Sequence, residues 1–303
     1  MTHLLAEHKS PNTIRAYTQG VTAYRRWATV QGLEQSGKDP DSGSLLSRAS
    51  VEAFTAFLLE GGAEPATAKA RQRGVRRFSA WLAAEGEIKE DELRSLSPPK
   101  LDDKIPGALD EAQLKALLAT CSKSLTRGNA FHDIRDEAII RLMTESMVRA
   151  SELLAMTVAD VDIRAGTAVV RKGKGGKGRL VGFGPQTARA IDKYNRARRR
   201  HPLCNAVTQF WLGAPKTGRG SGALSYTALY HALQRRGEEI GLRVHPHMLR
   251  ATGAIRWREK GGSVPGLLTV AGWSSLEMAQ RYVRAAESRL AVDEAHKLGL
   301  GDL

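Results

Sequence analysis

A proline-rich stretch divides the 303-residue chain into two parts of unequal length. Residues 95–109 read SLSPPKLDDKIPGAL, with three prolines, one glycine and little apolar periodicity. Proline interrupts helices and central strands, so a segment of this kind is typical of a linker. We therefore predict a small domain over residues 1–96, a linker over residues 97–108 and a larger domain over residues 109–303. A chain of this length commonly forms two domains.

The first part of the chain shows only helical patterns. Ser10 and Pro11 favour a helix start, because serine caps free backbone N–H groups and proline fits the first turn. Further helices are expected near Ser50 and from Pro65 towards Gly86, where apolar residues recur at helical spacing. The helix near Ser50 is predicted to bury four apolar side chains, those of Val51, Phe54, Phe57 and Leu58. We thus predict a small all-helical domain.

The helix that begins at Pro65 carries a basic arc, formed by Lys69, Arg73, Arg76 and Arg77. Taken alone, such an arc is equally typical of a solvated surface. The whole chain, however, has a formal net charge of +14 and an isoelectric point of about 10.0, which favours a polyanionic partner. No run of eighteen apolar residues predicts a membrane span, so nucleic acid is favoured over a membrane. We predict that the arc contacts the backbone of double-stranded DNA. The alternative for the whole chain is a basic protein of the ribosomal or chaperone-like kind.

The second part combines helices with one short hairpin. Helices are expected after Asp110, from about His132 to Glu145, from Pro185 to Arg199 and from Ser225 to Ile240. Residues 167–171 and 179–183 resemble two short strands joined by KGKGGKG. The fold class predicted for the chain is therefore mainly α with a small β-hairpin or sheet, an α+β protein.

Three features suggest sites that the sequence does not support on closer inspection. The glycines from Gly173 to Gly178 have phosphate-loop spacing, but arginine and leucine follow where Lys-Ser or Lys-Thr is required, and the loop joins two strands. His245 and His247 have no third metal ligand at a characteristic spacing. Cys121 and Cys204 form no CxxC motif and are expected to be structural thiols of a reduced compartment. We predict no metal and no cofactor.

Five motifs occur in a recognisable order. They are RASELLAM (residues 149–156), GKGGKGRL (173–180), HPHMLR (245–250), AGW (271–273) and QRY (280–282). Together they resemble the tyrosine recombinase, or phage integrase, family. SPNTIRAY (residues 10–17) resembles the start of that family's helical core-binding domain, so the likeness covers both parts of the chain. It implies a core-binding, SAM-like DNA-binding domain followed by a catalytic domain with a C-terminal tail helix, in a short form without an arm-binding domain.

The resemblance also implies roles for individual residues. Tyr282 would attack a DNA phosphodiester and leave a 3′-phosphotyrosine and a free 5′-hydroxyl. Arg149 and Arg250 would hold the non-bridging oxygens, and Glu152 would support Arg149. The remaining implied roles are proton donation to the 5′-oxygen by Lys174 or its competitor Lys177, assistance by His247, an indole N–H donor in Trp273, and DNA contacts by Lys177 and Arg179.

Elementary chemistry agrees with these roles. A phenol with a pKa near 10 is a poor nucleophile at neutral pH, and nearby cations favour both its phenolate and the pentavalent phosphorus. Two departures from the family pattern concern local geometry. Met147 stands in a turn that commonly holds a glycine before Arg149, so it must either avoid or tolerate a positive φ angle. After Arg250, Ala251-Thr252-Gly253 replaces the more usual His-Thr-hydrophobic run.

The family's way of working sets the expected partners. Members act as homotetramers on paired DNA sites with inverted-repeat core sequences and exchange strands through a Holliday junction. Residues 285–298 are long enough for a tail helix that packs on a neighbouring subunit in trans. We expect a cytoplasmic, nucleoid-associated integrase of a phage or mobile element. Xer-type resolution of chromosome or plasmid dimers, a catalytically inactive DNA-binding relative and a type IB topoisomerase are the alternatives.

Overall fold

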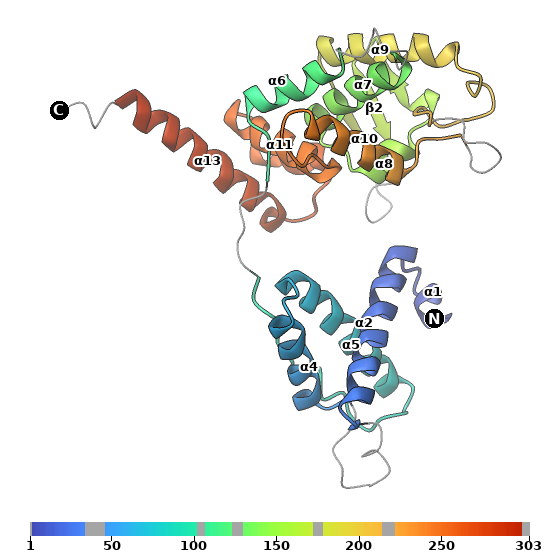
Figure 1. Cartoon of the computed structure of the whole chain (residues 1–303), viewed down its shortest axis with the longest axis vertical. Helices are drawn as coiled ribbons and strands as arrows, with labels where there is room; N and C mark the ends of the chain where they lie inside the picture. Colours follow the sequence, from blue (N-terminus) through green and yellow to red (C-terminus); the bar gives the residue numbers. More distant parts are fainter. Residues whose placement is uncertain are drawn as a thin grey trace. The chain divides into compact units, whose positions relative to one another are not determined.

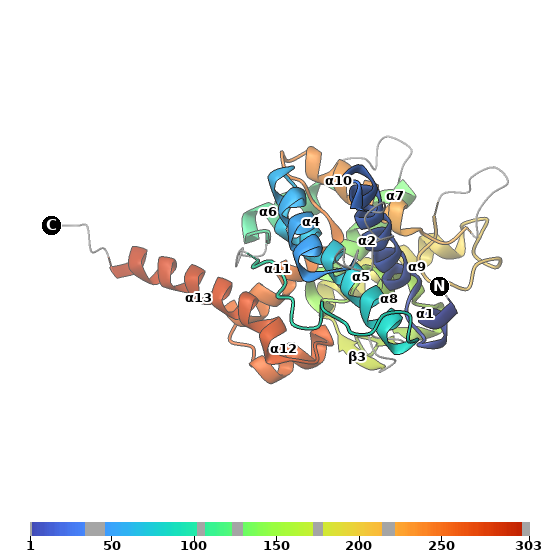
Figure 2. The same ribbon diagram turned by 90° about the horizontal axis from the view of Figure 1, so that it is seen from below.

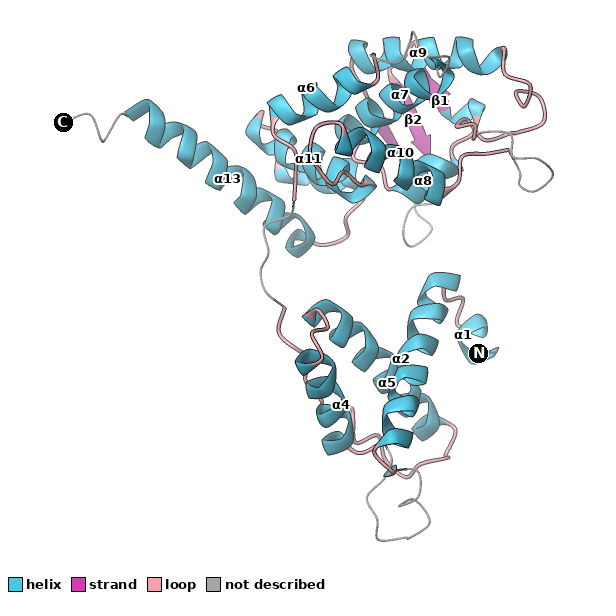
Figure 3. Ribbon diagram, viewed as in Figure 1, coloured by secondary structure: helices cyan, strands magenta, loops and turns pink. Residues whose placement is uncertain are grey.

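The computed structural model describes residues 2–33, 46–101, 107–122, 130–171, 178–213 and 222–298. It divides into two compact units, Met1–Asp103 and Lys104–Leu303, and the division falls inside the stretch 97–108. Helices dominate both units, and one small antiparallel sheet lies in the second (Figure 1 and Figure 3). The predicted fold class is therefore confirmed. None of the described helices has the length and apolar character that crossing a membrane requires.

The first unit is built around two helices in direct backbone contact. Its helices are α1 (Thr2–Ala6), α2 (Pro11–Val30), α4 (Arg48–Glu60) and α5 (Pro65–Ala84). Ser10 caps α2 as predicted, since its hydroxyl accepts a hydrogen bond from the Thr13 N–H at 3.2 Å. Helices α2 and α5 cross at Gly20 and Gly74, where a Cβ on Gly74 would lie only 2.7 Å from the Tyr17 carbonyl oxygen. Any larger residue would force the two helices apart.

The core of this unit lies between α2, α4, α5 and the segment that follows α5. Tyr24, Val51, Phe54, Val75 and Leu93 are buried there. One prediction was wrong: the Phe57 side chain is 52% exposed. Phe57 touches the edge of this core, with its ring 6.4 Å from that of Trp27, whereas Phe54 points into it.

The second unit begins with helices and continues through the sheet. Its elements are α6 (Glu111–Thr120), α7 (Ala130–Ser146), α8 (Ala150–Ala155), a 3₁₀ turn (Val158–Asp160), β1 (Val161–Asp162), β2 (Thr167–Val170), β3 (Arg179–Gly182), α9 (Pro185–Arg199), α10 (Tyr226–Glu238), α11 (Pro246–Glu259), α12 (Val264–Ala271) and α13 (Leu276–Leu298). The sheet has the order β1-β2-β3, and Val170 pairs with Arg179 at the end of the predicted hairpin. Strand β1 was not predicted, because two residues are too few to show an alternating pattern.

A buried ionic network fixes α10 to α7 in this unit. The Arg236 guanidinium donates to Asp133 at 2.5 Å, to Asp136 at 3.1 Å and to the Thr120 carbonyl at 2.9 Å. Cys121 lies next to this network, and burial raises the pKa of its thiol to about 12. A thiol of such low acidity is inert at neutral pH, in agreement with a structural role for Cys121.

Helix α11 is the centre of the second unit's architecture and packs against both α7 and α13. It approaches α7 closely at Gly253, where a Cβ would lie 2.8 Å from the Met147 Cγ atom. Helix α13 packs on α11 with its first half and then projects away from the rest of its unit (Figure 1 and Figure 2). The first half of this helix carries Tyr282.

Candidate active site

A pocket of about 380 Å³ in the second unit gathers residues that are far apart in the sequence. Arg149 lies before α8, His247 and Arg250 lie on α11, Trp273 follows α12, and Tyr282 lies on α13. All five line this one pocket. The other lining residues are Ala150, Tyr226, Pro246, Met278 and Arg281.

Tyr282 is the phenol of the pocket and is held on two sides. Its hydroxyl oxygen lies 3.5 Å from His247 Nε2, and its ring stacks on Trp273 with 4.8 Å between centroids and an interplanar angle of 13°. Only 4% of Tyr282 is exposed. Burial raises the pKa of this phenol above its ordinary value, although Arg281 and Arg250 oppose the shift. Tyr282 is therefore protonated at neutral pH and must lose its proton to attack.

His247 is suited to accept that proton. Burial lowers the pKa of its imidazole, and the positive charge of Arg250 lowers it further. His247 is thus neutral at neutral pH, and a neutral imidazole has one nitrogen that can accept a hydrogen bond or a proton.

Arg149 is oriented by its own helix start. The Glu152 carboxylate accepts the Arg149 backbone N–H at 2.8 Å and its guanidinium Nη1 at 2.7 Å. The Arg149 Nη2 atom donates to the Gly272 carbonyl at 2.9 Å. In the preceding turn Met147 has a φ angle of 53°. Of the two outcomes considered for this turn, Met147 thus tolerates a positive φ angle and does not avoid it.

Arg250 is held by carbonyl groups inside the unit. Its Nη1 donates to the Met147 carbonyl and its Nη2 to the Ala271 carbonyl at 2.6 Å. The guanidinium carbon lies 5.2 Å from the centre of the Trp273 ring, a cation–π distance. Burial lowers the pKa of Arg250 to about 10, so it remains positively charged at neutral pH.

The pocket thus combines a phenol, a neutral imidazole and two fixed guanidinium groups. Comparison with known proteins gives the family of the chain. Residues 108–289 match the phage integrase family. The chain belongs to that family. Tyrosine recombinase XerC of Xanthomonas campestris is 30% identical over 301 residues, which cover 98% of this chain and 86% of the relative. Tyrosine recombinase XerD of Ralstonia nicotianae is 28% identical and covers 92% and 85% of the two chains.

Solved structures of this family share the fold. The structure of XerH site-specific recombinase bound to a palindromic difH substrate, in a post-cleavage complex, superposes with a TM-score of 0.72. The two sequences are 20% identical, and the match covers 93% of this chain and 79% of XerH. The family match over residues 108–289 and the 30% identity to XerC show that this chain is a tyrosine recombinase, an enzyme that breaks and rejoins DNA.

Two of the predicted site residues lie outside the described residues, and two of the predicted DNA contacts make bonds within the protein that the sequence did not indicate. Lys174 and Lys177 are the former. Arg179, whose contact with DNA stays a prediction, donates to both Glu152 oxygens, at 3.0 and 2.7 Å, and to the Val270 carbonyl at 2.9 Å. Arg76 donates to the carbonyls of Leu93 and Arg94, both at 3.2 Å, in the segment after α5.

The other three basic residues of the predicted arc lie on α5 with different exposure. Arg73 and Arg77 are exposed, and Lys69 is half-buried. Sequence reasoning missed two polar residues that line the pocket of Tyr282, Tyr226 and Arg281. Arg281 could have been found from its position next to Tyr282, whereas no motif pointed to Tyr226 at the first turn of α10.

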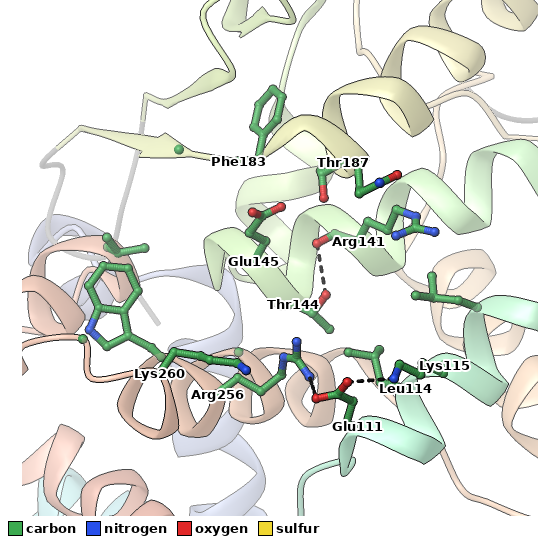
Figure 4. A pocket seen from close by; sticks show the side chains of 17 residues that line it. Glu111, Leu114, Lys115, Arg141, Thr144, Glu145, Phe183, Thr187, Arg256 and Lys260 are labelled. Carbon is green, nitrogen blue, oxygen red and sulfur yellow. Dashed lines mark hydrogen bonds and ion pairs between the residues drawn. The ribbon is translucent and has the colours of Figure 1, made fainter.

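The second unit of this recombinase has a further, larger pocket away from the tyrosine. Its volume is about 800 Å³, and it lies among α6, α7, α11 and the end of β3 (Figure 4). Glu111 on α6 pairs with Lys115 at 2.8 Å and with Arg256 of α11 at 3.9 Å, as Figure 4 shows. Lys260 and Arg141 add positive charge to a lining that also holds Glu145, and Leu114 and Trp257 add apolar surface.

Proposed function

We propose that this tyrosine recombinase is of the Xer type and resolves identical, paired DNA sites. The convergence of Tyr282, His247, Arg149, Arg250 and Trp273 on one pocket carries the proposal of catalytic activity. The named relatives over almost the whole chain are XerC and XerD proteins. They support the Xer-type alternative better than the phage or mobile-element integrase that we expected first.

The pocket supports a covalent mechanism. Tyr282 Oη attacks the phosphorus while its proton passes to His247 Nε2, which lies 3.5 Å away. The bond from phosphorus to the 5′-oxygen breaks, and that oxygen takes a proton from Lys174, or from Lys177 as the second candidate. The products are a 3′-phosphotyrosine and a free 5′-hydroxyl, and attack by a new 5′-hydroxyl reverses the step and joins the strands.

The cations of the pocket stabilise this reaction electrostatically. Arg149 and Arg250 supply N–H donors to the two non-bridging oxygens, where negative charge grows as phosphorus becomes pentavalent. The Trp273 indole supplies a further donor. Glu152 acts through Arg149, because its carboxylate is fully used by hydrogen bonds to arginines.

The proposed partner is double-stranded DNA with inverted-repeat core sites, bound by a homotetramer in the nucleoid. Arg73 and Arg77, exposed on α5 of the core-binding unit, are proposed to contact the DNA backbone together with Lys69. Such contacts hold the protein on the duplex without reading its sequence.

The tail of α13 is proposed to pack on a neighbouring subunit. Arg289 is anchored within its own unit, to Glu259 at 3.4 Å and to the Ala108 carbonyl at 3.3 Å. Beyond it the described side chains are exposed, and Leu290, Val292 and Leu298 offer an apolar surface. The basic and apolar pocket of Figure 4, on another copy, suits this segment, because Glu294 complements its Arg256 and Lys260.

The test uses DNA that the full-length protein selects from randomised duplexes. A nick placed in the selected duplex lets the cleaved fragment diffuse away, so that a covalent adduct accumulates. The wild type should form an adduct mapped to Tyr282, whereas Tyr282→Phe should bind the duplex and form none. Binding by the wild type without any adduct would make the chain an inactive DNA-binding relative.

Resolution then separates the Xer type from its alternatives. A plasmid with two directly repeated copies of the selected site should be converted into two circles. Relaxation of supercoils without recombinant circles would identify a topoisomerase. Recombination only between two dissimilar sites would identify an integrase.

A further inference from the structure

Three arginines donate hydrogen bonds to three consecutive backbone carbonyls at the C-terminal end of α12. The carbonyl oxygens of Val270, Ala271 and Gly272 accept hydrogen bonds from Arg179, Arg250 and Arg149, respectively, at 2.9, 2.6 and 2.9 Å. The last carbonyls of a helix lack intrahelical partners and carry its negative dipole end, so they attract cations.

Two other carbonyls near this helix end accept hydrogen bonds from the backbone. The backbone N–H groups of Gly272 and Trp273 donate to the carbonyls of Thr269 and Leu268. The arginines therefore complete the cap of α12. Because Arg250 and Arg149 are bound to adjacent carbonyls, the helix end fixes the distance between their guanidinium groups.

Arg179 differs from the other two arginines in its surroundings. Its side chain is only 10% exposed and does not line the catalytic pocket, whereas Arg149 and Arg250 do. It joins the helix end to Glu152, and Glu152 in turn holds Arg149. Its guanidinium also lies against Gly272, where a Cβ would be 2.9 Å from the Arg179 Cζ atom.

We propose that Arg179 is a positioning residue of this recombinase, which locks Glu152 against the end of α12 and so sets the orientation of Arg149 relative to Arg250. The three directional bonds of the Arg179 guanidinium make this possible, and a lysine ammonium could supply the charge but not the planar geometry. The inference rests on the proposed role of Arg149 in holding the phosphate.

The electrostatics of Glu152 fit this role. Burial alone raises the pKa of a carboxyl group, but the hydrogen bonds from Arg179 and Arg149 outweigh it and keep the pKa of Glu152 below its ordinary value. The carboxylate is therefore charged and has two cationic partners. Loss of Arg179 would leave Arg149 as its only cation and would pull that guanidinium away from the phosphate.

The test compares Arg179→Met and Arg179→Lys in the full-length protein on the nicked, selected duplex. The rate of adduct formation at saturating DNA should fall about 10²-fold in both, since a misplacement of about 1 Å in a catalytic group has that effect. The Kd for the unnicked duplex should stay within about twofold of the wild type, because Arg179 lies outside the pocket. Arg164→Met, which removes an exposed arginine from the β1–β2 turn, is the matched control and should leave the rate unchanged.

A second comparison isolates the path of the effect. Arg149→Ala combined with Arg179→Met should be no slower than Arg149→Ala alone, because Arg179 acts only through Arg149. Multiplied losses in the double variant would overturn the proposal, as would full activity of Arg179→Lys. A raised Kd with an unchanged rate at saturation would show that Arg179 contacts DNA instead.

A measurement without DNA separates this proposal from the proposed function. In the wild-type protein the Arg149 guanidinium N–H groups should exchange slowly with water in NMR spectra, and in Arg179→Lys this protection should be lost. Unchanged protection in Arg179→Lys would refute the positioning role even if the protein proved to cleave no DNA. Near-ultraviolet circular dichroism checks that each variant is folded.

Discussion

Gly253→Ala should damage both stability and catalysis, because Gly253 is the contact point between α11 and α7. A Cβ at this position would lie less than 3.0 Å from the Thr144 carbonyl oxygen and 2.8 Å from the Met147 Cγ atom. Real Cβ atoms essentially never approach other atoms so closely. The methionine can turn aside, but the carbonyl is backbone, so α11 itself must move.

The size of both effects follows from this geometry. Forcing an additional carbon into a packed interior costs roughly 1–3 kcal/mol of the free energy of unfolding. Arg250 lies one turn before Gly253 and donates to the Met147 carbonyl at the end of α7. A shift of α11 by about 1 Å therefore displaces Arg250, and the cleavage rate should fall about 10²-fold.

Urea unfolding measures the first effect and adduct formation on the nicked duplex the second. Gly182→Ala is the control, since its Cβ would meet only the Gly166 carbonyl at 3.9 Å, an ordinary contact. Adding Met147→Ala to Gly253→Ala should restore little, because the clash with Thr144 remains. Wild-type stability and rate in Gly253→Ala, or full rescue by Met147→Ala, would refute this account of the contact.

Three further outcomes are expected. Since the pKa of His247 lies below its usual 6.5, the wild-type cleavage rate should decline only below that pH, as the imidazole becomes charged. His247→Asn should be slower and show no such decline. A wild-type decline that began above pH 6.5 would contradict a neutral His247. Trp273→Phe keeps a ring beside Tyr282 but removes the indole N–H, and it should slow adduct formation about 10²-fold. Trp273→His keeps a hydrogen-bond donor and should recover most of the rate. Equal rates in the two variants would argue against the donor role. Truncation after Arg289 keeps the ion pair with Glu259, so the unfolding midpoint should not change, while the tetramer on paired sites, followed by sedimentation, should be lost.

Local features of the molecule were predictable from the sequence. The Ser10 cap and the helix starts after Asp110 and at Pro185 depend on residues within one helical turn, and the structure has all three. The pairing of Arg149 with Glu152 is also a local interaction, because the two residues lie three positions apart at the start of one helix. Interactions of this range depend on residues that are close together in the sequence.

Contacts between distant segments were not predictable in this way. Arg179 was expected to contact DNA, and the sequence did not show that β3 places it against Glu152, 27 residues earlier in the chain. Arg76 belonged to a basic arc on the helical wheel, but the wheel does not show the carbonyls of the segment after α5. In both cases a guanidinium satisfies buried or half-buried acceptors that only the tertiary fold brings near.

The position of Tyr282 links the chemistry of the pocket to the tail. Tyr282 and the exposed side chains of Leu290, Val292 and Leu298 belong to one continuous helix, α13, so a force on the tail would be transmitted to Tyr282. Within one chain Tyr282 is 4% exposed, stacked on Trp273 and protonated, and an aromatic pair of this kind stabilises its arrangement by roughly 0.5–1.5 kcal/mol. Leu290, Val292 and Leu298 are 43%, 53% and 62% exposed, so burying each of them on a partner would yield about half of the roughly 1.5–3 kcal/mol that a fully exposed side chain gives. Docking of the tail, as proposed, would therefore outweigh the stacking of Tyr282 on Trp273 taken alone, and we expect cleavage to depend on assembly.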